Sequence, residues 1–158
     1  MRIEILKKPD GSGVLRCTRE GGSVTWEKQT KHGAVFALHD LTHYAVETVL
    51  GYRNGFFGLL AQGWDMDDIG GKGKRGALPD EAIEVEKIVG VFDCERASGT
   101  LWTAAEFKQF APRSLTCEEI QQIRVVRSRL FQEWSAVPSG GKLELRLEIA
   151  TASTSRIP

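Results

Sequence analysis

The spacing of apolar residues changes along this chain, and that change constrains the fold most. Residues 142–149 alternate strictly between charged positions and the apolar residues Leu143, Leu145, Leu147 and Ile149. A period of two is typical of a β-strand with one face on a core and the other in water. We expect this segment to return and pair with strands near the N-terminus, because its backbone groups need hydrogen-bond partners.

The first thirty residues predict three more short strands. Apolar residues take alternate positions in three successive segments: Ile3 and Ile5, Leu15 and Cys17, then Val24 and Trp26. Glycine-containing turns at 9–13 and 20–22 separate these segments. The pattern predicts an antiparallel meander with one face on a core and one in water.

From residue 36 onward the apolar spacing becomes helical. Segment 36–50 contains no glycine or proline and ends at Gly51, and a second helix is expected to open at Pro79 and run to about Val89. A short helical piece is expected at 55–62. Capping boxes begin at Thr103 and Thr116, and the second starts the longest predicted helix, 117–134. Residues 63–78 form the one long irregular segment.

These patterns predict a single α+β domain over residues 1–150. An antiparallel sheet of about four strands, the N-terminal meander plus the C-terminal strand, is covered on one face by three to four helices. Residues 151–158 carry no pattern and are expected to fray.

Composition narrows the function classes. The 158 residues hold 21 Lys and Arg against 21 Asp and Glu, and 41% are hydrophobic. This balance argues against a disordered chain and against a nucleic-acid binder, which is usually basic. The longest apolar run, 55–61, is too short to cross a bilayer, and residues 1–13 do not resemble a signal peptide. We therefore expect a cytoplasmic protein without a membrane partner.

One short motif carries chemistry. His39 and His43 are four residues apart on a predicted helix, so their side chains project from the same face. The segment His-Asp-x-x-His resembles the His-Glu-x-x-His signature of zinc peptidases, with an aspartate, one methylene shorter, in place of glutamate. We predict that His39 and His43 bind Zn²⁺ or another divalent ion, with Asp40 or Glu47 as general base.

A third metal ligand must come from elsewhere, because a straight helix does not bring His39, His43 and Glu47 to one ion. Asp65 in the acidic cluster of the irregular segment is the first candidate, and Glu81 and Glu84 are the second. The most specific function that fits is a metal-dependent hydrolase acting on a small-molecule or peptide substrate.

The alternative interpretation is non-enzymatic. Two histidines beside an apolar helix face also suit a structural role in an interaction domain or a homo-oligomer, hydrogen-bonded to backbone groups or to Glu47. The segment 71–76 fits Gly-x-Gly-x-x-Gly, but no strand precedes it, so dinucleotide binding is not expected. A metal site predicts converging carboxylates around the histidines, and a structural role predicts that protein groups satisfy both rings.

Overall fold

The computed structural model describes residues 1–10, 12–29 and 33–148. Four strands and six helices follow one another along this part of the chain. Their order is β1 (Arg2–Lys7), β2 (Gly13–Thr18), β3 (Val24–Gln29), α1 (Gly33–Leu50), α2 (Phe56–Ala61), α3 (Met66–Ile69), α4 (Asp80–Ser98), α5 (Ala104–Phe110), α6 (Cys117–Ala136) and β4 (Lys142–Arg146). The segment 151–158, for which fraying is expected, and Ile149, the last apolar residue of the alternating segment, lie outside the described residues.

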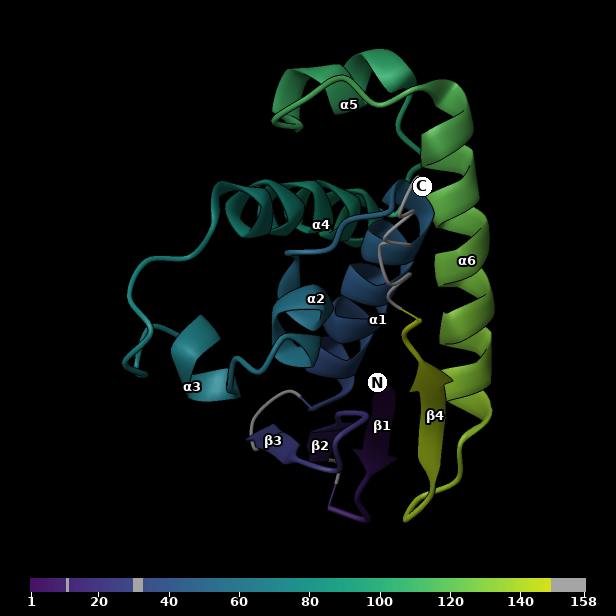
Figure 1. Cartoon of the computed structure of the whole chain (residues 1–158). Helices are drawn as coiled ribbons and strands as arrows, with labels where there is room; N and C mark the ends of the chain where they lie inside the picture. The colour runs from purple at the N-terminus through teal and green to yellow at the C-terminus, as the bar shows by residue number, and fades with distance from the viewer. Residues whose placement is uncertain (11, 30–32, 149–158) are drawn as a thin grey trace, which may run out of the picture.

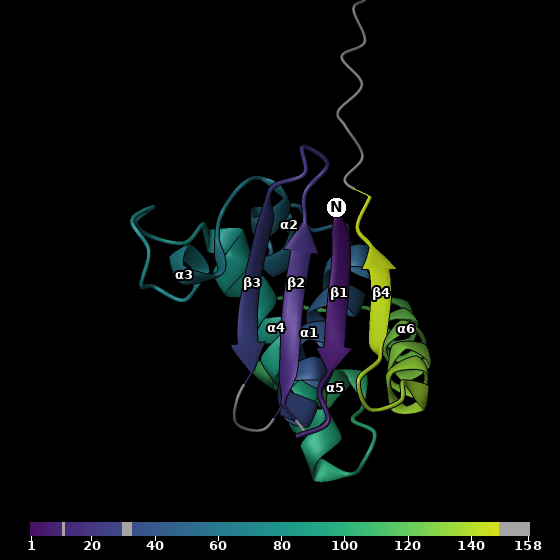
Figure 2. The same cartoon turned by 90° about the horizontal axis from the view of Figure 1, so that it is seen from below.

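The four strands form one antiparallel sheet in the order β3-β2-β1-β4. The C-terminal strand therefore returns to pair with β1, as the alternation predicts, and Leu145 lies opposite Ile3. In Figure 2 the helices of the described chain lie on one side of this sheet. The predicted α+β architecture is confirmed.

The apolar residues of β3 do not face the helices. Because cross-strand partners share a face, the pairing of Cys17 with Thr25 turns Thr25 and Gln29 inward. Val24 and Trp26 consequently lie on the outer face, where 61% of Trp26 is exposed. Alternation identifies two faces of a strand but does not tell which of them is buried.

Helix α1 lies at the centre of the helical layer and packs against α4, α6 and β2 (Figure 1). Its residues Leu41 and Ala45 are completely buried, together with Ile3 and Ile5 of the sheet. On α6, the buried residues Ile120, Ile123, Leu130 and Trp134 form the face that packs against the core.

The helix boundaries show which ends the local sequence predicts correctly and which depend on packing. Both predicted capping boxes are present, because Thr103 and Thr116 each accept a hydrogen bond from the backbone three residues later. Helix α4 extends nine residues past the expected end near Val89 and stops at Gly99, whose φ is 70°. It continues through Gly90 because Val91 and Phe92 beyond it are buried, and such packing offsets the cost of about 1 kcal/mol for a helical glycine.

Candidate metal centre

The two histidines of α1 project side by side from one face of the helix. The centroids of the His39 and His43 rings are 4.8 Å apart, and the ring planes are inclined by 79°. His43 is almost completely buried, whereas 31% of the His39 side chain is exposed. Their spacing on an unbroken helix produces this neighbouring arrangement, as the sequence predicts.

Helix α4 supplies a carboxylate between the two rings. Glu86 Oε2 lies 3.1 Å from His43 Nε2, and Glu86 Oε1 lies 3.8 Å from His39 Nε2. One ligand atom from each of these three residues lies within 4.8 Å of the other two. His39, His43 and Glu86 therefore form a group that could hold a metal ion.

A further carboxylate lies behind each histidine. Asp93 Oδ2 is 2.8 Å from His39 Nδ1, and Glu47 Oε1 is 3.4 Å from His43 Nδ1. When Asp93 accepts a hydrogen bond from Nδ1 of neutral His39, Nε2 keeps the lone pair that faces Glu86. Histidines that bind metals commonly have this carboxylate partner on the nitrogen that does not bind the metal.

Glu47 is held by the start of α2. Its carboxylate accepts hydrogen bonds from the backbone N–H groups of Phe57 and Gly58, at 3.2 and 3.1 Å. A Cβ atom on Gly55 would lie only 2.5 Å from Glu47 Cδ, so a glycine is needed at this position. These contacts fix the carboxylate against the Nδ1 side of His43.

The site carries more negative than positive charge. Burial lowers the pKa of His43, but Glu47 and Glu86 together outweigh burial and raise that pKa to about 9. The hydrogen bond from His43 lowers the pKa of Glu86, while the contact with His39 lowers that of Asp93 against the effect of burial. The carboxylates thus favour a cation between them, either a proton on His43 or a metal ion.

Asp40, a candidate base in the sequence, faces the sheet. It follows His39 by one residue, which turns its side chain by about 100° around the helix. Its Oδ2 accepts a hydrogen bond of 2.6 Å from Gln29 Nε2 of β3, and burial raises the pKa of Asp40 to about 6. The carboxylate connects α1 to the sheet.

The structure does not bring Asp65 to the histidines. Its carboxylate binds Arg19 Nη2 at 3.0 Å, at the start of α3. The second candidates, Glu81 and Glu84, are on the correct helix but bind other groups: Glu81 accepts from the backbone of Arg53, and Glu84 accepts from the hydroxyl of Tyr52.

Sequence reasoning missed Glu86 and Asp93. The two residues are seven positions apart on α4, which places them two turns apart on one face of the helix. That spacing is the signal that could have found them, once α4 is known to pack against α1.

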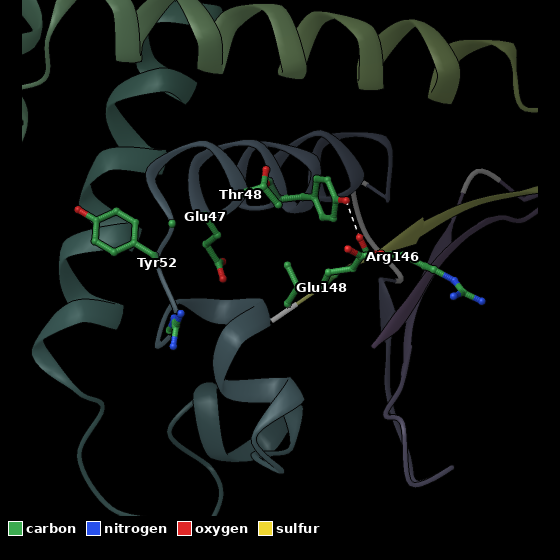
Figure 3. Close-up of a pocket in the computed structure, with 9 residues that line it drawn as sticks. Glu47, Thr48, Tyr52, Arg146 and Glu148 are labelled. Atoms are coloured by element: carbon green, nitrogen blue, oxygen red, sulfur yellow. Dashed lines mark hydrogen bonds between the residues drawn. The ribbon is translucent and has the colours of Figure 1, made fainter. Parts of the chain in front are cut away.

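Two pockets border the site. The first has a volume of about 440 Å³, and its lining includes His43 and Glu86 among mainly apolar residues. The second, about 450 Å³, is shown in Figure 3, where Glu47 points from α1 toward α2. The hydroxyl of Tyr44, another lining residue, donates to the carbonyl oxygen of Arg146. The second pocket includes Glu47, which contacts His43 on the Nδ1 side of the ring. The first pocket includes Glu86, which contacts Nε2, so of these two pockets it is the one next to the proposed metal ligands.

Comparisons with family models, curated proteins and solved structures find no match for this chain. Within the described part of the chain, every helix is too short or too polar to span a bilayer. The functional argument therefore depends on the geometry of the site alone.

Proposed function

We propose that this protein binds a divalent metal ion through Nε2 of His39, Nε2 of His43 and a carboxylate oxygen of Glu86. One observation carries the proposal: both histidines turn Nε2 toward the same carboxylate, and each has a second carboxylate next to Nδ1. The hydrogen bond between His39 Nδ1 and Asp93 prepares the Nε2 lone pair of His39 for a metal ion. Nδ1 of His43 makes no hydrogen bond among the described residues and faces Glu47 at 3.4 Å.

The donor set favours Zn²⁺. Two imidazole nitrogens and one carboxylate oxygen match catalytic zinc sites, in which bonds of about 2.0–2.1 Å place tetrahedral donors ~3.3 Å apart. Glu86 Oε2 lies 3.1 Å from His43 Nε2, Glu86 Oε1 lies 3.8 Å from His39 Nε2, and one ligand atom from each of the three residues lies within 4.8 Å of the other two. Three protein ligands leave one position of a tetrahedral shell for water, and solvent reaches Glu86, whose side chain is 62% exposed.

A metal-dependent hydrolase is the specific activity we propose. A divalent ion held by His39, His43 and Glu86 would lower the pKa of a water to about 7 and so supply a nucleophile for the hydrolysis of an ester or amide. The overall reaction would add the elements of water across the carbon–oxygen or carbon–nitrogen bond that is cleaved. Water is the only co-reactant.

Glu47 and Asp93 act in this proposal as positioning residues. Each carboxylate orients one imidazole by contacting Nδ1, and neither touches the reacting atoms. Asp40 connects α1 to Gln29 of the sheet, and Asp65 binds Arg19, so the proposal assigns neither residue to the metal.

A non-enzymatic domain is the second candidate function. The observation that favours it is that protonated His43 lies between Glu47 and Glu86, at 3.4 and 3.1 Å, and its positive charge stabilises both carboxylates without a metal. In this alternative the histidines only stabilise the contact of α1 with α4.

Metal titration separates the two candidates. Protein purified without a histidine tag is titrated with Zn²⁺ in a calorimeter, and bound metal is measured by elemental analysis. We expect one zinc ion per chain, and Glu86→Gln is expected to weaken binding by more than about 100-fold, since it removes a direct ligand. Glu133→Gln, at an exposed carboxylate of α6 that pairs with Arg129, is the matched control and should not change binding.

Zinc-dependent hydrolysis of a nitrophenyl ester then tests the activity. We expect turnover by the zinc-loaded protein and none by the Glu86→Gln variant. Equal metal content in the wild type and in the double variant His39→Ala/His43→Ala would contradict the metal site itself.

A further inference from the structure

A mainly apolar pocket opens beside His43 and Glu86. Its walls come from α2, α3 and α4, and include Phe56, Leu59, Ile69 and Ile83. Phe56 and Ile69 are half-buried, and 43% of Ile83 is exposed, so the protein itself leaves apolar surface accessible here. A concave apolar space with a few polar groups at one edge is typical of small-molecule sites.

The polar edge of this pocket consists of the groups that we assign to the metal. His43 and Glu86 line it, and the ring of Phe56 lies 5.2 Å from that of His43. A ligand in the pocket would therefore have one end beside the ion and the other among hydrocarbon side chains. Lys87 also lines the pocket and brings a positive charge to the same edge.

We propose that this pocket holds the hydrocarbon part of a small acyl compound whose carbonyl or carboxylate oxygen binds the metal ion at His39, His43 and Glu86. This inference rests on the proposed function and adds the substrate class to it. The chemistry follows from the two ends of the site: a divalent ion accepts an oxygen ligand, while the adjoining walls favour an alkyl or aromatic group.

The volume of the pocket limits the size of this compound. About 440 Å³ lies within the range of sites for small molecules, of about 300–1,000 Å³. A charged or strongly polar acyl group would lose its hydration against Leu59 and Phe56, where only hydrocarbon is available. The site thus selects short apolar acyl groups over polar ones.

A titration with carboxylates of increasing length tests the inference. Protein loaded with Co²⁺, whose visible absorption reports its coordination, is titrated with acetate, butyrate and hexanoate. Because each methylene moves from water to hydrocarbon, we expect affinity to rise by about fourfold per added methylene. The spectrum should change with each ligand, since the carboxylate enters the coordination shell.

Two matched variants test whether the dependence of affinity on chain length arises in this pocket. Ile83→Lys puts a charge at the mouth of the pocket and should abolish the dependence on chain length, while Co²⁺ still binds. Val125→Lys makes the same change at an exposed apolar residue of α6, and should leave the dependence intact. Thermal unfolding of both variants checks that they are folded.

The outcomes distinguish this inference from the proposed function. If the protein binds the metal but has equal affinity for the three carboxylates, the inference is wrong and the metal site is unaffected. The same holds if Ile83→Lys and Val125→Lys reduce the dependence on chain length equally. No binding of Co²⁺ or Zn²⁺ would overturn both. Chain-length dependence that needs both the ion and Ile83 would support the inference.

Discussion

Replacing Glu47 by glutamine tests how the site is built. The side chain of Glu47 is completely buried and accepts two backbone hydrogen bonds, from Phe57 and Gly58, while facing His43 Nδ1. Glutamine has nearly the same shape, but only one of its two terminal atoms accepts hydrogen bonds. Since Oε1 of Glu47 accepts from Phe57 and Oε2 accepts from Gly58, the amide nitrogen of glutamine must face one of these two backbone N–H groups.

The magnitude follows from these contacts. Hydrogen bonds to a charged group contribute about 1.5–3 kcal/mol each, and a buried donor left without a partner costs about 1–3 kcal/mol. One lost bond and one unpaired donor, partly offset by removing a buried charge, give a destabilisation of about 3 kcal/mol for Glu47→Gln. For a chain of this length, that corresponds to a melting temperature lower by roughly 6–12 °C.

Two assays measure the consequences of Glu47→Gln. Thermal unfolding of the metal-free protein reports the stability, and zinc titration reports the site, where the loss of a carboxylate behind a metal-bound histidine weakens binding by about 10–100-fold. The control Glu133→Gln should change neither. Unchanged stability together with unchanged zinc affinity would refute the role of Glu47 in orienting His43.

Two further predictions concern packing and charge. Gly55→Ala should destabilise the protein by about 1–3 kcal/mol in denaturant titrations, because the new Cβ would press against the buried Glu47 side chain, whereas Gly21→Ala, which meets nothing within 4 Å, should be neutral. The hydrogen bond from Lys142 lowers the pKa of Glu4, against the effect of burial. The stability that this contact adds is therefore present above pH 4.5 and lost as the pH falls, so acid unfolding followed from pH 6 to pH 3 should be less steep in Glu4→Gln; equal steepness would contradict the assignment.

The sequence was enough to predict the architecture because most strands and helices bury one face. In β1, β2 and β4 the residues on that face are apolar, so alternation also predicts the orientation. In the edge strand β3 the inward positions are polar: Thr25 accepts a hydrogen bond from the Met66 backbone, and Gln29 binds Asp40. Those partners lie in other elements, 41 and 11 residues further along the chain, so the local pattern of β3 does not predict them.

The sequence predicts only the part of the candidate site that lies on α1. The positions of His39 and His43 follow from helical geometry, but their carboxylate partners depend on how α1 packs against α4. That helix offers several glutamates, and Glu81 and Glu84 are as plausible in the sequence as Glu86. Which of them faces the histidines is decided by the contact of the two helices, where His43 lies near Glu86 and His39 near Asp93.

Anomalous diffraction at the zinc absorption edge tests the central claim most directly. Crystals of the protein with one equivalent of Zn²⁺ should show a single anomalous peak bonded to Nε2 of His39, Nε2 of His43 and a carboxylate oxygen of Glu86, at about 2.0–2.1 Å from each. A peak at any other place, or no peak at all with one equivalent of zinc present, would contradict the metal centre proposed for this fold.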